Sequence, residues 1–304
     1  MSKTIKEITL VSTLNGHQNP IFTLAQPEHS NLLYSGGNDK GVVEWDLSTM
    51  RFNRVLCQVT SSIYTLLSIP DSTLLAIGMR SGQIMIVDRE NQSLKANLNT
   101  EKGAVFSLQI IPSKRELIAI GEEGVAYVWD LDSFELLYRF KISDTTVRVI
   151  AVDPEGKFLA FGDKQGYIYV YSVIDFQFVT KQKIHDLAVT SLLFHAGYLF
   201  SGARDAKLTK LNPVNLNVEL SITAHMFTVY AIQQSYSEDL IATVSRDKTM
   251  KIWRIKDFSL VKNISRDRGF DSHILSINAL LWKNQNLYTV SDDKTIKIWK
   301  IDAL

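Results

Sequence analysis

Residues 245–254 have the sequence SRDKTMKIWR, and residues 291–300 have the sequence SDDKTIKIWK. Each stretch places a polar turn before a short alternating segment that ends in tryptophan, Trp253 or Trp299. Alternation with a period of two is typical of a β-strand that has one buried face. The two tryptophans are 46 positions apart, which indicates a repeated unit of about that length.

The same rhythm runs along the whole chain. A short apolar segment begins once in each unit, at Ile21, Ile63, Val105, Val147, Val189, Val229 and Ile274. A bulky anchor ends another segment of each unit, at Trp45, Val87, Trp129, Tyr171, Leu211, Trp253 and Trp299. Neighbouring markers are 40 to 46 positions apart, and turn residues separate the apolar runs. This pattern predicts an all-β fold, a seven-bladed β-propeller of four-stranded antiparallel blades, with residues 1–304 as one domain.

The two ends of the chain suggest how the ring is closed. Only five residues follow Trp299, so the last unit lacks its own fourth strand. The segment from Ile5 to Thr13 precedes the first unit and alternates as a strand does. An open ring would leave unpaired strand edges, which favour aggregation. We therefore expect residues 5–13 to join the last blade as its outer strand.

Several short motifs resemble those of the WD-repeat family. Gly16-His17 precedes the first strand of a unit, while Trp45-Asp46 and Trp129-Asp130 end third strands. The resemblance covers essentially all 304 residues. It implies a hydrogen-bonded tetrad inside a blade, because a buried indole, hydroxyl and imidazole must all find partners.

The tetrad residues that the resemblance implies are unevenly distributed. They are His17, Ser35, Asp39 and Trp45 in blade one, His185, Ser201 and Asp205 in blade five, His225, Thr243, Asp247 and Trp253 in blade six, and Thr289, Asp293 and Trp299 in blade seven. In blade seven, His273 is one residue before Ile274 rather than four, so its spacing does not predict a tetrad histidine. Blades two to four lack the histidine, and we expect apolar packing alone to hold them.

Composition narrows the range of functions. Lys and Arg total 33 against 32 Asp and Glu, a net charge of +1, which argues against bulk attraction to nucleic acid or an anionic membrane. No signal-peptide pattern and no apolar run of about 18 residues is present. The single cysteine, Cys57, excludes an internal disulfide. We expect an intracellular, cytoplasmic protein, with the nucleus as the alternative.

The sequence does not predict catalysis. Copies of one His–Ser/Thr–Asp set around a ring indicate scaffolding, whereas nucleophilic catalysis needs one singular constellation. No Cys or His pair has zinc-ligand spacing, and no phosphate-binding glycine motif occurs in the right context. We predict that the protein is not an enzyme and uses no metal, cofactor or small-molecule substrate.

Candidate contact residues follow from the family resemblance. It implies that the position after each leading apolar residue lies near the mouth of the central channel; these residues are Phe22, Tyr64, Phe106, Arg148, Thr190, Tyr230 and Leu275. Aromatic residues and arginine are enriched in binding hot spots, although the aromatics could instead pack between blades. Nearby turns carry Arg80, Lys164, Arg204 and Arg246 against Glu122 and Asp292. The residues added between blades six and seven, 265–272, include Arg266, Arg268 and Phe270.

The basic excess of these turns favours an acidic partner, and a solvated rim is the alternative. Residues 265–272 are either a contact loop or a tolerated extension. We predict a non-catalytic protein-protein interaction scaffold that binds a protein or a short peptide at the channel mouth. The alternatives are a nucleic-acid-associated assembly subunit and, with least support, an enzyme that uses the channel.

Overall fold

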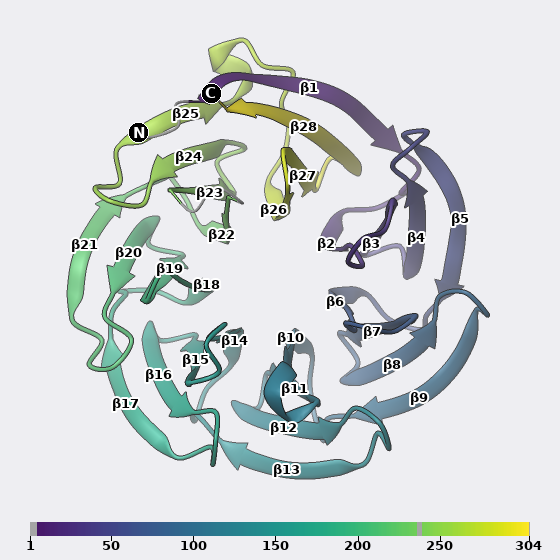
Figure 1. The fold of residues 1–304 in the computed structure, drawn as a ribbon, viewed down its shortest axis with the longest axis vertical. Coiled ribbons are helices and arrows are strands. Elements are labelled where there is room, and N and C mark those ends of the chain that lie inside the picture. Colours follow the sequence, from purple (N-terminus) through teal and green to yellow (C-terminus); the bar gives the residue numbers. More distant parts are fainter. Residues whose placement is uncertain (1–4, 236–238, 304) are drawn as a thin grey trace.

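Seven β-sheets surround one axis in a computed structural model, which describes residues 5–235 and 239–303 (Figure 1). Each sheet has four antiparallel strands, the first nearest the axis and the last at the outer rim. The predicted all-β, seven-bladed propeller is therefore confirmed. Second and third strands are buried almost throughout, whereas outer strands such as residues 136–141 are largely exposed. Buried faces explain the apolar, β-branched character of the inner strands.

The strands follow the chain in order. Blade one contains β2 (Ile21–Ala25), β3 (Leu32–Gly37), β4 (Gly41–Asp46) and β5 (Arg51–Gln58), and blade two contains β6 (Ile63–Ser68), β7 (Leu74–Met79), β8 (Gln83–Asp88) and β9 (Ser93–Asn99). Blade three contains β10 (Val105–Ile111), β11 (Glu116–Gly121), β12 (Val125–Asp130) and β13 (Leu136–Lys141), and blade four contains β14 (Val147–Val152), β15 (Phe158–Asp163), β16 (Tyr167–Ser172) and β17 (Phe178–Lys183). Blade five contains β18 (Val189–His195), β19 (Tyr198–Ala203), β20 (Lys207–Leu211) and β21 (Val218–Thr223), and blade six contains β22 (Val229–Gln234), β23 (Leu240–Ser245), β24 (Met250–Arg254) and β25 (Leu260–Ile264).

Blade seven is built from both ends of the chain. It contains β26 (Ile277–Lys283), β27 (Asn286–Ser291) and β28 (Thr295–Ala303), and its outer strand is β1 (Ile5–Asn15). β1 runs antiparallel to β28, with Ile8 opposite Ile301 and Asn15 opposite Thr295. The predicted closure by residues 5–13 is confirmed, and the strand extends two residues further than expected.

Two short 3-10 helices complete the described secondary structure. They are η1 (Pro112–Lys114) and η2 (Arg266–Arg268). No helix within residues 5–235 and 239–303 is long and apolar enough to cross a membrane.

The hydrophobic core lies between blades. One cluster, for example, joins Ile84 of blade two to Val105 and Leu117 of blade three. A glycine in a second strand lets the next blade pack directly against the backbone. A Cβ at Gly202 would lie 2.7 Å from Cγ1 of Val229 in the next blade, so the observed spacing leaves no room for a side chain.

Each turn between the second and third strands contains a residue in the left-handed region, with φ between 62° and 92°. These residues are Lys40, Gly82, Gly124, Gly166, Ala206, Lys248 and Lys294. Blades two to four place glycine there, which has no steric penalty in this conformation. In blades six and seven an aspartate fixes the turn instead: Asp247 accepts the N–H of Thr249 at 3.0 Å, and Asp293 that of Thr295 at 3.1 Å. The glycine-rich turns of blades two to four thus have a conformational cause.

The expected start of the first strand in blade seven was wrong. Ile277, not Ile274, pairs with Ser291 in the way that Ile21 pairs with Gly37 in blade one. Ile274 and Leu275 are exposed in the preceding loop. The loop between blades six and seven is therefore three residues longer than the sequence suggested, and its apolar tip resembles the beginning of a strand.

Candidate functional site

Every first strand has a β-bulge at its second residue. The register shifts between Ile21 and Thr23, and the same shift recurs in all seven blades. A bulge turns one side chain out of the regular alternation, and such features often border functional sites. The bulged residues, here called the mouth ring, are Phe22, Tyr64, Phe106, Arg148, Thr190, Tyr230 and Asn278, all partly buried. Leu275, expected at this position in blade seven, lies outside the ring, because the strand starts three residues later.

Neighbouring side chains of the mouth ring touch from blade to blade. The rings of Phe22 and Tyr64 are 5.8 Å apart, and those of Tyr64 and Phe106 are 5.5 Å apart and nearly parallel. The guanidinium carbon of Arg148 lies 4.9 Å from the Phe106 ring centre. The expected alternative, packing between blades, therefore describes part of what these aromatic residues do.

Arg148 is the charged member of the mouth ring. Its Nε is buried and has no hydrogen-bond partner in the described part of the chain. Burial lowers the pKa of this guanidinium, and the positive charge of Arg204 lowers it further, while Tyr230, Tyr64 and Glu122 act in the opposite direction. Arg148 on β14 and Tyr230 on β22 hold the bulged positions on either side of Thr190 on β18, so they lie on the same side of the mouth.

A second ring of side chains surrounds the first. It consists of the residues whose backbone N–H bonds to the carbonyl just before each first strand, as Arg204 does to Ala188 and Arg246 to Thr228. This ring, here called the turn ring, contains Asn38, Arg80, Glu122, Lys164, Arg204, Arg246 and Asp292. The candidates Arg80, Arg204 and Arg246 thus occupy equivalent places, and the positive charges gather over blades four to six.

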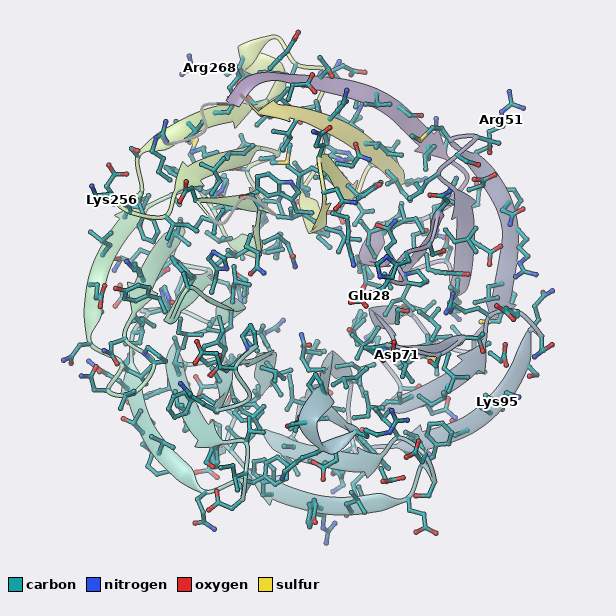
Figure 2. All side chains as sticks on the ribbon, viewed as in Figure 1. Glu28, Arg51, Asp71, Lys95, Lys256 and Arg268 are labelled. Carbon is teal, nitrogen blue, oxygen red and sulfur yellow. The ribbon has the colours of Figure 1, made fainter. Side chains whose placement is uncertain are left out.

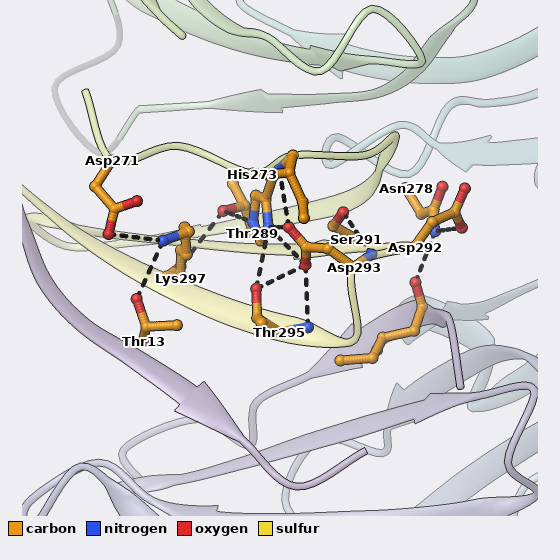
Figure 3. Close-up of polar contacts among 12 residues, drawn as sticks. Thr13, Asp271, His273, Asn278, Thr289, Ser291, Asp292, Asp293, Thr295 and Lys297 are labelled. Atoms are coloured by element: carbon orange, nitrogen blue, oxygen red, sulfur yellow. Dashed lines mark hydrogen bonds and ion pairs between the residues drawn. The ribbon is translucent and has the colours of Figure 1, made fainter. Parts of the chain in front are cut away.

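Thr190 and Asn278 of the mouth ring form hydrogen bonds between neighbouring blades. Thr190 donates a hydrogen bond to the carbonyl of Val229 in the next blade at 2.5 Å. Asn278 Nδ2 donates to the carbonyl of Ile21 at 2.8 Å and to Asp292 at 2.8 Å, so it joins blade seven to blade one (Figure 3). Asn278 was not identified from the sequence, because its position depends on the corrected register.

The structure places residues 265–272 away from the mouth ring. Arg268 lies at the outer rim (Figure 2), and both Arg266 and Arg268 are exposed. Phe270 packs against the core of blades six and seven, with its ring 6.4 Å from that of Trp299. Asp271 accepts from Lys297 Nζ at 3.3 Å, which ties the loop to β28. These contacts fix the loop but do not bring its arginines near Arg148 or Arg204.

The histidine networks have one repeated geometry. In blade one, His17 Nδ1 is 2.6 Å from Asp39, His17 Nε2 is 2.6 Å from Ser35 Oγ, and Trp45 Nε1 donates to the same hydroxyl at 2.7 Å. Blade six has the equivalent contacts through His225, Asp247, Thr243 and Trp253, and blade five through His185, Asp205 and Ser201. In blade five, Leu211 stands at the tryptophan position, so its network has no indole donor.

Blade seven has a complete network, which the sequence spacing did not predict. His273 Nδ1 is 2.9 Å from Asp293, and its Nε2 is 2.9 Å from Thr289 (Figure 3). Trp299 Nε1 donates to the same Thr289 hydroxyl at 3.1 Å. His273 precedes Ile277 by four residues, the same spacing as His17 before Ile21. The doubt about this network came from the misplaced strand.

The donors and acceptors of these networks agree with a neutral imidazole beside a carboxylate. A carboxylate can only accept, so Nδ1 carries the proton and Nε2 accepts from the hydroxyl, whose oxygen accepts from the indole. Burial lowers the pKa of His225, despite the opposing effect of Asp247. Burial raises the pKa of Asp247, but hydrogen bonds from His225 and backbone Met226 outweigh it and hold the pKa well below its usual range.

The expectation of apolar packing alone fits blade two but is wrong for blades three and four. In blade three, Tyr127 donates to Glu123 at 2.7 Å and accepts the N–H of Glu101 at 3.2 Å. Blade two has Val59, Ile77 and Val87 at the tetrad positions, all within one hydrophobic cluster. Blade four buries Asp163, which accepts from the hydroxyls of Ser143 at 2.9 Å and Tyr169 at 3.1 Å. Ser143 stands at the histidine position, and Phe161 fills the place of the usual hydroxyl, so a different polar network satisfies this interior.

The opposite end of the propeller has a hollow of about 920 Å³. It is lined by the ends of first strands and the turns that follow, including Glu28, Asp153 and Trp282, and Glu28 projects toward the axis in Figure 2. Within the described ranges, no three His, Cys, Asp or Glu side chains are grouped so as to bind a metal ion. Burial raises the pKa of the Cys57 thiol to about 11, so it is a poor nucleophile at neutral pH.

Fold and networks together define the class of protein, a seven-bladed propeller with recurring His–Ser/Thr–Asp–Trp networks in its blades. A family model described as WD domain, G-beta repeat matches residues 8–46, 217–254 and 265–300. These are the three units in which all four network residues are present. Three of the seven units therefore match the WD repeat, and the chain as a whole is a seven-bladed β-propeller.

Several known proteins resemble the chain. It is 23% identical to the target of rapamycin complex subunit LST8 of Mus musculus over 258 residues, which is 84% of this chain and 56% of that protein. It is 26% identical to the transcription factor unc-37 of Caenorhabditis elegans over 131 residues, 43% of this chain and 21% of that one. WD repeat-containing protein 3 of Homo sapiens is 24% identical over 123 residues, 40% of this chain and 12% of that one. The chain spans about half of the length of LST8 and less of the other two.

Proposed function

We propose that this protein is a non-catalytic interaction scaffold that binds a protein or peptide partner on the face bearing the mouth ring and the turn ring. The observation that carries the proposal is the position of Arg148, Arg204 and Tyr230 on three consecutive blades, four to six, at that face, beside the stacked aromatics of blades one to three. Tyrosine and arginine are enriched among residues that dominate binding energy. Arg148 is only partly buried, so its guanidinium adds a cationic donor for a partner's carboxylate or carbonyl oxygen.

The similar proteins support the same class of function. One is named as a subunit of a complex, and another as a transcription factor. From the first of these we infer that this chain is also an assembly component that contacts other proteins. The compartment that suits this role is the cytoplasm, with the nucleus as the alternative.

Two features favour binding over catalysis. The histidines that could act as bases are buried in structural networks, with His17, His185, His225 and His273 at most 5% exposed. Their hydroxyl partners Ser35, Ser201, Thr243 and Thr289 are completely buried, so a substrate could not reach them.

The test is affinity capture from native lysate with wild type and the double variant Arg148→Ala, Tyr230→Ala. We expect specific partners to be lost from the variant. The matched control is Arg115→Ala with Tyr138→Ala, which removes the same residue types from other exposed sites and should keep all partners. Circular dichroism and melting curves of both variants verify folding.

Partners retained by the Arg148 and Tyr230 variant would contradict the proposed face. Equal loss from the control would mean that the captured proteins respond to general surface charge.

A further inference from the structure

The loops that enter the first strands differ around the mouth face. In each blade, two residues at the loop tip follow the histidine position of the network. They are polar in blades one and two, with Gln18 and Asn19 in the first and Thr60 and Ser61 in the second. In blades five, six and seven they include Leu187, Met226, Phe227, Ile274 and Leu275. We call these five residues the apolar sector.

The apolar sector is exposed. Met226 is 80% exposed, and the other four side chains are 43% to 52% exposed. Two of the five have backbone N–H groups that join the histidine networks: Met226 N–H bonds to Asp247 at 3.0 Å, and Ile274 N–H bonds to Asp293 at 3.1 Å. The networks use these backbone groups, whereas the side chains of Met226 and Ile274 are exposed to solvent. Large apolar side chains gathered at adjacent loop tips are typical of a contact surface.

Positive charge adjoins the apolar sector. Arg204 belongs to blade five and Arg246 to blade six, and the guanidinium carbon of Arg246 lies 5.9 Å from the Phe227 ring centre. Neither arginine forms an ion pair within the described residues. The nearby acids are engaged elsewhere: Asp186 pairs with Lys207 at 3.1 Å, and Asp292 accepts from Asn278. Two cationic side chains are thus available beside apolar ones.

We propose that the apolar sector, with Arg204 and Arg246, binds a partner's peptide segment in which acidic residues flank a large apolar side chain. The apolar residue would be buried against Met226 and Phe227, and each carboxylate would accept paired hydrogen bonds from an arginine. This inference rests on the proposed function and specifies its partner and the part of the face that binds it.

The composition favours a peptide over nucleic acid. A phosphate-binding surface needs a dense basic stripe, whereas Glu122 and Asp292 interrupt the turn ring and the protein's net charge is only +1. Phe227 is the one aromatic side chain among the five tips, so the apolar sector could stack at most one base, whereas the other four tips are non-aromatic.

The experiment selects binders from a displayed library of random 12-residue peptides on the full chain. We expect enrichment of Asp or Glu next to Leu, Ile, Phe or Met. A selected peptide should bind the Arg204→Glu, Arg246→Glu variant about 30-fold more weakly, as expected for central contacts. The control Arg51→Glu, Lys256→Glu makes the same charge change at the rim (Figure 2) and should weaken binding less than about threefold, since distant charges are screened.

A second pair of variants tests the apolar contacts. Met226→Ser with Phe227→Ser should weaken binding of the selected peptide about 30-fold. The control is Val218→Ser with Leu260→Ser, at exposed positions on the outer strands of blades five and six. It should leave the peptide affinity unchanged. Melting curves verify that all four variants fold.

Three outcomes would overturn the inference. The library could yield no binder or no acidic enrichment, the sector variants could bind as wild type does, or random oligonucleotides could compete for the sector with strong salt dependence. If captured partners still require Arg148 and Tyr230 in any of these cases, the proposed function stands and only the inference fails.

Discussion

Blade two and blade seven have the same four-stranded backbone but different interiors. Blade two has the apolar residues Val59, Ile77 and Val87 where blade seven buries His273, Thr289 and Trp299. Blade two is continuous in the chain, while blade seven joins β1 to β28. The comparison shows that the hydrogen-bonded network is not required to form a blade. The network occurs in the blade that closes the ring and also in the continuous blades one, five and six, so closure alone does not account for it.

The largest expected effect comes from removing residues 1–13, which takes most of the outer strand from blade seven. β28 would lose most of its outer partner, and the contact of Lys297 with Thr13 would disappear. We expect the melting temperature to fall by more than about 10 °C, given that about 1 kcal/mol shifts it by 2–4 °C in a chain of this order of size.

Differential scanning calorimetry would measure this change. Val11→Ser, which alters an exposed side chain of the same strand, should shift the melting temperature little. An unchanged melting temperature in the truncated protein would disprove closure by β1.

A smaller loss of stability is expected from replacing one network residue by alanine. His273→Ala leaves the Asp293 carboxylate and the Thr289 hydroxyl without their imidazole partner, and should lower the free energy of unfolding by about 3 kcal/mol. The equivalent change in blade two, Val59→Ala, should cost about 1 kcal/mol, because only apolar packing is lost.

Urea unfolding of both variants would measure the difference. Equal losses in the free energy of unfolding would mean that the imidazole contributes packing only and that its hydrogen bonds add no net stability.

The smallest expected effect is a difference in stability between serine variants of blades one and five, which both contain a histidine network. Ser35→Ala removes the acceptor of Trp45 as well as the partner of His17, whereas Ser201→Ala affects only His185, since Leu211 replaces tryptophan in blade five. We expect the blade-one variant to lose about 1 kcal/mol more stability. Urea unfolding measured side by side would test it, and a larger loss in blade five would show that the indole bond contributes nothing.

Much of the fold was predictable from sequence because burial repeats at a fixed period. Strand positions such as Ile21 and Trp45 must be apolar in each blade, so the rhythm is visible without coordinates. Closure by residues 5–13 was predictable for a related reason, since an unpaired outer edge in the last blade would be unfavourable.

The misplaced features have physical causes as well. Ile274 and Leu275 are as apolar as a strand start but are exposed, and a sequence does not reveal which apolar residues face solvent. That error concealed both the His273 network and Asn278. The blade-four network escaped notice because its aspartate, Asp163, lies two residues before the usual position and replaces histidine with Ser143. Placing Ser143 in line with His17 would have revealed it.

The pairing of β1 with β28 has a consequence for synthesis in the cell. Lys297 and Thr13, which touch across this seam, are 284 positions apart in the chain. At ordinary translation rates of 5–20 residues per second, the first strand leaves the ribosome roughly 15 to 60 s before its partner. Throughout that interval an alternating strand edge is available to other nascent chains, and chaperone occupancy of the ribosome-bound intermediate would determine how much protein reaches the closed ring.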